Sequence, residues 1–172
     1  MIFVYLFIGA VTGILLISAV MPRRYNVEKS TVINKTIDDV MDKVGDLNNY
    51  ASWNPWQQMD PSATKTVSGI PKSVGHKYVW HGKKVGEGSL TIRSINVNHI
   101  NFDLEFLKPW KSHARDNWMF KGENNGGTRV TWQNSGDLPW PMARLMGPII
   151  NKNLNHQFEK GLNNLKKMVE GS

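Results

Sequence analysis

Apolar and polar residues alternate through most of the chain between residues 64 and 136. The clearest run is HINFDLEFLKP (99–109), where every second residue from Ile100 to Phe106 is apolar and the residues between are mostly polar. A strand places successive side chains on opposite faces, so this period of two predicts strands with one apolar face. Comparable runs are TKTVSG (64–69), GHKYVWHG (75–82), GEGSLTIRSINV (86–97), SHARDNWMFKG (112–122) and GGTRVTWQNSG (126–136). Gly, Asn and Pro separate them, which predicts an antiparallel meander.

Residues before and after this meander predict one more strand and several helices. YNVEKSTVIN (25–34) is rich in Val, Ile and Thr, and is expected to form the first strand. Thr36 with Asp39 makes a helix N-cap signature before a short apolar stripe that ends near Gly45, and residues 47–51 are expected to add a further turn. From residue 139 to residue 170, apolar residues recur every three or four positions, which predicts one long amphipathic helix.

Together these elements predict an α+β domain. An antiparallel sheet with one apolar face must cover that face, and the long C-terminal helix is the element available to do so. The 150 residues beyond the N-terminal segment are enough for one compact domain, so we expect a single domain over residues 23–172.

The first 22 residues have the composition of a membrane segment. They contain no Asp, Glu, Lys, Arg or His, and as a helix they span roughly the ~30 Å hydrocarbon core of a bilayer. A cleaved signal peptide is the alternative, but it would need a basic region before the apolar stretch, so we expect residues 1–22 to be a single-pass anchor. Arg23 and Arg24 follow directly, and the tendency of basic residues to stay in the cytoplasm favours a cytoplasmic over a periplasmic domain.

The net charge limits the classes of binding partner that we expect. The chain carries 21 Lys and Arg against 14 Asp and Glu, a net charge of +7. A basic surface beside an anchor can be attracted to anionic lipid, or can simply be solvated. The lysines are scattered and no nucleic-acid-binding motif accompanies them, so nucleic acid is not expected as a partner.

Cysteine is absent, which excludes disulfides, thiolate nucleophiles and cysteine-ligated zinc. The five histidines show no metal-ligand spacing and are expected at solvent-facing positions, so no metal is predicted. No phosphate-binding loop, dinucleotide fingerprint or nucleophile elbow occurs, and no cofactor is expected.

The order of several short motifs resembles a known superfamily. WNPW (53–56), VGHKYVWHG (74–82) with GEGSLTI (86–92), DNWMF (116–120) with GGTRVTW (126–132), and FEKGLNNLKKMVE (158–170) together are similar to the START-like superfamily, in particular its bacterial polyketide cyclase/dehydrase-like branch. The resemblance covers residues 25–170. It implies a helix-grip fold, in which a curved seven-stranded antiparallel sheet surrounds the last helix and leaves an apolar cavity. It also implies binding of hydrophobic small molecules, with the WNPW loop near the cavity mouth.

Candidate ligand contacts are the large apolar side chains that the alternation and the resemblance place on the concave side. They are Trp53, Trp56, Tyr78, Trp80, Phe102, Phe106, Trp118, Trp132, Met146 and Ile150. An aromatic pocket and an ordinary core use the same residue types, so most of this set is expected to be core and a minority to touch a ligand. Trp53 and Trp56 suit either a ligand gate or a packing contact beneath a loop.

Asp116 is the candidate polar residue, because the alternation that buries Trp118 points it the same way. Buried, it would need a partner, and it would suit orienting a ligand hydroxyl or acting as an acid or base. The alternative, favoured because ion pairs are common, is a strand-end carboxylate in water or paired with Arg129 or Arg144. Asn153 and Gln157 interrupt the apolar stripe of the last helix and are further candidates to reach the cavity.

Three functional hypotheses follow. The first is a membrane-anchored, non-enzymatic domain that binds a lipid-like or polycyclic molecule. The second is a cyclase, aromatase or dehydratase in which Asp116, His81 or Tyr78 supplies acid-base chemistry. The third is an adaptor whose interior is filled by side chains. The sequence leaves the ligand and the oligomeric state open.

Overall fold

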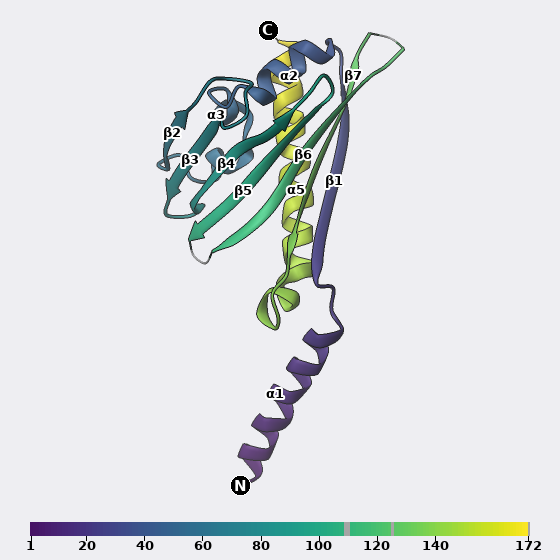
Figure 1. Cartoon of the computed structure of the whole chain (residues 1–172). Coiled ribbons are helices and arrows are strands. Elements are labelled where there is room, and N and C mark those ends of the chain that lie inside the picture. Colours follow the sequence, from purple (N-terminus) through teal and green to yellow (C-terminus); the bar gives the residue numbers. More distant parts are fainter. Residues whose placement is uncertain (109–110, 125, 172) are drawn as a thin grey trace.

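The computed structural model describes residues 1–108, 111–124 and 126–171. An N-terminal helix, α1 (Ile2–Val20), projects from a single α+β domain, as Figure 1 shows. The domain contains strands β1 (Arg24–Ile33), β2 (Thr64–Ser68), β3 (Lys77–Gly82), β4 (Gly86–Ile95), β5 (His99–Lys108), β6 (Ser112–Gly122) and β7 (Thr128–Asp137). Its helices are α2 (Ile37–Gly45), α3 (Tyr50–Trp53), α4 (Pro55–Met59) and α5 (Met142–Glu170).

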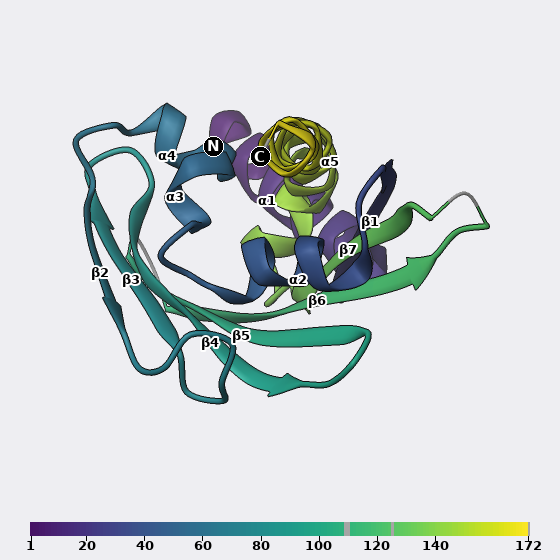
Figure 2. The same ribbon diagram turned by 90° about the horizontal axis from the view of Figure 1, so that it is seen from above.

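The strands form one antiparallel sheet of seven strands in the order β1-β7-β6-β5-β4-β3-β2. The sheet is strongly curved, and α5 lies over its concave face beside β1 (Figure 2). The short helices α2, α3 and α4 cover the rest of that face. The predicted fold class is confirmed, and every predicted strand is present with ends shifted by at most two residues. Ser172, the last residue of the predicted domain, lies outside the described residues.

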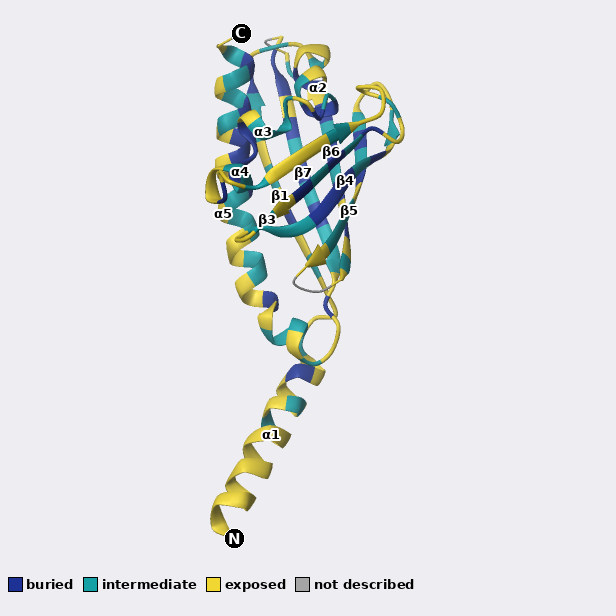
Figure 3. Ribbon diagram, turned by 90° about the vertical axis from the view of Figure 1, so that its left-hand side faces the viewer, coloured by how far each residue is buried: buried dark blue, intermediate teal, exposed yellow. Residues whose placement is uncertain are grey.

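The core lies between the concave face and α5, as the burial colours of Figure 3 show. Trp132 of β7 connects the two layers, because its ring stacks on Phe158 of α5 at a centroid distance of 3.9 Å and on Trp118 of β6 at 4.6 Å. Gly161 allows this approach: a Cβ there would lie 2.8 Å from the Trp132 ring. A larger residue at position 161 would push α5 away from the sheet.

Short sequence motifs determine where the first helices of the domain begin. Thr36 and Asp39 form the predicted capping box, in which the Asp39 N–H donates to the Thr36 hydroxyl and the Thr36 N–H donates to the Asp39 carboxylate. The turn expected over residues 47–51 forms slightly later, as α3.

The long helix differs from its prediction in one respect. It begins at Met142 instead of residue 139, and the first turns of its apolar stripe are not buried: Met142, Met146 and Ile149 are exposed. The reason is geometric, because these turns extend past the edge of the sheet toward α1 (Figure 1).

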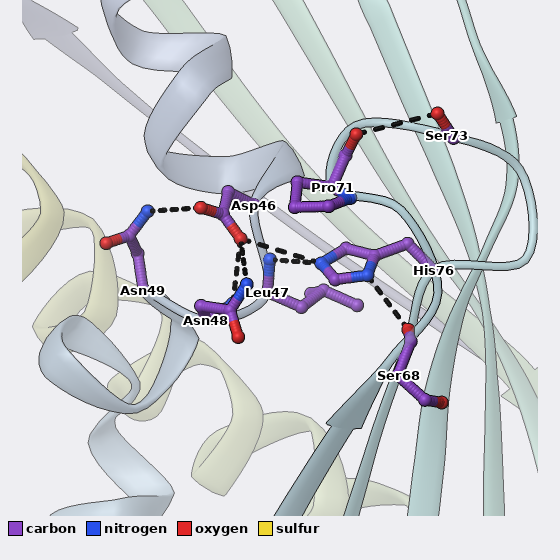
Figure 4. Close-up of polar contacts among 8 residues, drawn as sticks. All are labelled: Asp46, Leu47, Asn48, Asn49, Ser68, Pro71, Ser73 and His76. Carbon is purple, nitrogen blue, oxygen red and sulfur yellow. Dashed lines mark hydrogen bonds and ion pairs between the residues drawn. The ribbon is translucent and has the colours of Figure 1, made fainter.

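His76 corrects the expectation that every histidine faces solvent. It is 1% exposed and connects the segment between α2 and α3 with the end of β2 (Figure 4). Its Nε2 accepts a hydrogen bond from the Leu47 N–H at 3.0 Å, so its Nδ1 carries the proton and donates to the Ser68 carbonyl at 2.9 Å. The alternation of GHKYVWHG (75–82) places His76 on the same side as Tyr78 and Trp80, so the pattern contained a signal for its burial that the expectation of solvent-facing histidines did not use.

Replacing His76 with leucine removes both bonds and leaves the buried Leu47 N–H without this partner. We expect a loss of about 2–4 kcal/mol in the free energy of unfolding, measured by urea denaturation of the detergent-solubilised chain. His156→Leu on the exposed side of α5 is the control and should change stability by less than about 0.5 kcal/mol. Equal stabilities of the two variants would show that His76 does not hold the loops together.

Candidate functional site

A partly enclosed cavity lies between the concave face of the sheet, α4 and α5, and its volume is about 130 Å³. Aromatic side chains make up much of its wall. Trp56 comes from α4, Tyr78 and Trp80 from β3, and Phe106 from β5. The remaining aromatic lining residues are Tyr25, Tyr50, Trp132 and Phe158.

Five of the ten predicted ligand contacts line this cavity: Trp56, Tyr78, Trp80, Phe106 and Trp132. Three others are core residues with at most 2% exposure that do not line it: Trp53, Phe102 and Trp118. Met146 and Ile150 lie outside the lining: Met146 is exposed and Ile150 is half-buried. The structure thus separates a cavity wall from a core, a division that alternation alone does not make.

The two tryptophans of WNPW have different positions. Trp53 packs edge-on against Trp118 and Trp132 at centroid distances of 5.5 and 5.9 Å, so it is a packing residue. Trp56 is half-buried and lines the cavity. Asn54 separates them by capping α4, since its side chain accepts a hydrogen bond from the Trp56 N–H. Of the two tryptophans, Trp56 is therefore the one at the cavity.

Asp116 also lines the cavity, and its carboxylate is held by neutral donors. It is 5% exposed. The indole N–H of Trp118 donates to Oδ1 at 2.7 Å, that of Trp132 donates to both oxygens at 2.8 and 2.9 Å, and the Asn134 amide donates to Oδ2 at 3.0 Å. Asn134 in turn accepts a hydrogen bond from the Tyr25 hydroxyl at 2.8 Å.

The pairing of β6 with β7 produces this arrangement. Asp116 lies directly opposite Asn134 and Trp118 directly opposite Trp132, so four side chains converge on the concave face. The prediction that Asp116 lies in water or pairs with Arg129 or Arg144 is wrong. Arg129 pairs with Glu123 instead, and Arg144 donates to the carbonyl of Leu138. Both arginines therefore have other partners, which alternation on a single strand could not show.

Burial raises the pKa of Asp116 to about 6, and the three donors offset only part of that rise. Burial, and secondarily the negative charge of Asp116, raises the pKa of Tyr25 to about 12. The same two causes hold the pKa of Tyr50 well above its ordinary value. The cavity therefore contains one carboxyl group that titrates close to neutral pH and hydroxyls that stay protonated.

Other proposed polar contacts lie elsewhere. His81 is exposed, 3.7 Å from Glu87 at the β3–β4 hairpin, and does not line the cavity. Asn153 is exposed, and Gln157 is half-buried without lining the cavity. Within the described residues, no group of three or more His, Asp or Glu side chains is placed to hold a metal ion.

Sequence reasoning missed four of the lining residues just described: Tyr25, Tyr50, Asn134 and Phe158. Tyr25 and Asn134 lie near strand ends where a single apolar or amide residue gives little signal. Phe158 belongs to the predicted apolar stripe of α5, and pairing it with Trp132 requires the helix–sheet contact. Tyr50 lies in α3, which is too short to show a periodic pattern.

The raised pKa of Asp116 predicts a pH dependence of stability. Between about pH 4 and 6 the folded chain keeps a proton that the unfolded chain has lost, so stability falls by about 3 kcal/mol as pH rises through this window. Urea denaturation at several pH values measures the slope. Asp116→Asn should remove this component of the slope, whereas Asp103→Asn, at an exposed position on β5, should keep it. Parallel pH profiles for the wild type and Asp116→Asn would contradict the assignment.

Solved structures share this fold at low sequence identity. A protein of Staphylococcus aureus, SA2116, superposes with a TM-score of 0.67 at 11% identity, over 86% of this chain and 94% of that one. TTHA0849 of Thermus thermophilus gives a TM-score of 0.63 at 18% identity, over 84% and 97%. DynU16, from the dynemicin biosynthetic locus, gives 0.59 at 14% identity, over 84% of this chain and 47% of its own. Among curated proteins, no sequence matches this chain.

One family matches nearly the whole domain. Residues 24–170 match the family described as polyketide cyclase/dehydrase and lipid transport. This range begins at β1 and ends with α5, so it contains the entire sheet, the cavity and Asp116. From β1 to α5, this chain belongs to the polyketide cyclase/dehydrase and lipid transport family.

Proposed function

We propose that this domain binds a small hydrophobic molecule in the cavity between the sheet, α4 and α5. The observation that carries the proposal is the cavity itself: aromatic side chains leave open space in the interior of a domain whose other large residues pack closely. Ligand sites are typically concave and apolar, with a few converging polar groups. Here the polar lining residues include Asp116 with its carboxylate, and Tyr25 and Tyr78 with their hydroxyls.

The volume limits the ligand. About 130 Å³ is below the roughly 300–1,000 Å³ of typical ligand pockets and close to the roughly 150 Å³ engineered cavity that binds benzene. The ligand we propose is therefore smaller than the lipid-like or polycyclic molecule expected from the sequence. The part of the ligand that fits inside the cavity has about the size of one aromatic ring or a short acyl segment.

Enzymatic activity is the second candidate, and the raised pKa of Asp116 favours it. A carboxyl group that titrates near 6 beside an apolar cavity suits general acid-base catalysis of a cyclisation or dehydration. Of the partners considered for it, Tyr78 lines the cavity and His81 does not. Binding is the simpler proposal, because it requires only the cavity.

We also propose that α1 anchors the domain in a membrane. Ile2–Val20 is long and apolar enough to cross a bilayer, and almost all of it is exposed. The junction of α1 with the domain lies beside the start of α5, where Arg144 reaches the Ala19 carbonyl at 3.5 Å. Trp140, Met142 and Met146 are exposed at this end. An apolar surface with a tryptophan suits a membrane–water interface.

Filling the cavity should abolish binding. Leu104 lines the cavity on β5, and Leu104→Trp should block it, whereas Leu107→Trp, at an exposed position on the same strand, should not. Fluorobenzene added to the detergent-solubilised chain should show a bound ¹⁹F resonance with the wild type and Leu107→Trp and none with Leu104→Trp. Partitioning into micelles is the same for all three, so identical spectra would contradict the cavity as a binding site.

The anchor proposal predicts that α1 remains on the protein. The chain should resist extraction from membranes by high salt, and the intact mass of the detergent-extracted protein should include residues 1–22. Removing residues 1–22 should release the remainder into the soluble fraction. A membrane-free product that is shorter by about the length of α1 would instead identify the segment as a cleaved signal peptide.

A further inference from the structure

The cavity lining and the chain as a whole differ in the sign of their charge. Eight of its lining residues are aromatic and one, Asp116, is a carboxylate. Among the described residues, the lining contains no lysine, arginine or histidine. This contrasts with the chain as a whole, whose net charge is +7. The basic side chains lie on the surface, so the interior site has the opposite character.

The negative charge of Asp116 has no cation beside it within the described part of the chain. Its three donors are two indoles and one amide, all neutral. Burial without an opposite charge is costly for an ionised group. The same carboxylate acts on the hydroxyls of Tyr25 and Tyr50, and both stay protonated and neutral. The site therefore holds a negative charge that nothing in the lining neutralises.

The hydrogen bonds of the carboxylate do not supply a positive charge. The carboxylate accepts four hydrogen bonds from three neutral N–H groups, two at each oxygen, with the Trp132 N–H shared between both oxygens. These bonds satisfy its acceptor positions and leave its negative charge without a counterion. Aromatic rings attract cations through the negative charge of their faces, so the rest of the wall also favours a positive group.

We propose that the cavity selects a small organic cation: a primary or methylated amine that carries one ring or a short apolar chain, with its ammonium group beside Asp116 and its apolar part among Trp56, Tyr78 and Trp80. This inference rests on the proposed binding function and names the chemical class of the ligand. The ammonium group supplies the missing positive charge. A neutral ligand of the same shape fills the space without neutralising the carboxylate, and an anion is repelled.

A matched pair of probes tests the proposal. Benzylamine and benzyl alcohol have nearly the same shape, but only the amine is a cation at neutral pH. Titration of the detergent-solubilised full chain, with Leu104→Trp as the blank for micelle partitioning, should show benzylamine binding tighter on the order of tenfold or more. In Asp116→Asn this preference should disappear, while benzyl alcohol still binds.

The pH dependence gives a second readout that needs no variant. As pH falls from neutral to below about 6, Asp116 takes up a proton and loses its charge, so the affinity for benzylamine should fall while that for benzyl alcohol stays constant. Tyr25, Tyr50 and Tyr78 surround the site from three elements and remain neutral over this range, so they do not contribute. Benzylamine itself stays a cation.

The outcomes separate the two proposals. Equal affinity of the wild type for both probes, or an amine preference that persists unchanged in Asp116→Asn, overturns the selection of a cation but leaves the binding function intact. Failure of both probes to bind above the Leu104→Trp blank overturns the binding function and with it this inference. If Asp116→Asn does not fold, the loss of amine affinity at low pH in the wild type decides the question.

Discussion

The pairing of β6 with β7 is the constraint on which the interior depends. It sets Asp116 opposite Asn134 and Trp118 opposite Trp132, and so places a carboxylate within reach of two indole N–H groups and an amide. A shift of one residue in this pairing would turn the side chains of one of the two strands to the convex face, so that Asp116 and Trp118 would no longer meet Trp132 and Asn134. Because the carboxylate cannot be buried without these donors, its hydrogen bonds also favour the correct register.

The same cluster links the sheet to the long helix. Trp132 donates to Asp116 through its ring nitrogen, while one face of its ring lies on Trp118 and the other on Phe158 of α5. Gly161 lets the helix come this close. Toward β3 and β5 the curved sheet moves away from α5, and side chains from α4 only partly fill the space (Figure 2). The cavity thus lies where the bent sheet moves away from the long helix.

Much of this fold was predictable because burial on one face imposes a period of two on strands and of 3.6 on helices. Alternation and the richness of residues 25–34 in Val, Ile and Thr identified all seven strands, and the Thr36–Asp39 signature located α2. The cavity wall was harder to predict. Trp53 and Trp56 are the same residue type in one short motif, and only the positions of α3 and α4 make Trp53 a core residue and Trp56 a lining residue. Met146 matches the apolar stripe of α5 but lies beyond the sheet, since periodicity does not show where a partner surface ends.

The polar part of the site illustrates the same limit. Alternation correctly pointed Asp116 inward, but two of its three partners, Trp132 and Asn134, lie 16 and 18 residues away on β7, and only the register brings them to Asp116. Its charged state was equally hidden, because it depends on how completely the surrounding aromatic side chains exclude water.

A direct titration of the Asp116 carboxyl group tests the central claim, that an aromatic cavity surrounds an uncompensated buried carboxylate. The ¹³Cγ chemical shift of aspartate in the labelled, detergent-solubilised chain, with Asp116 assigned by its loss in Asp116→Asn, reports this ionisation. We expect a midpoint near the pKa of about 6 that burial produces. A midpoint at or below the ordinary aspartate value of about 3.9 would contradict it, since the carboxylate would then be solvated or paired with a positive charge.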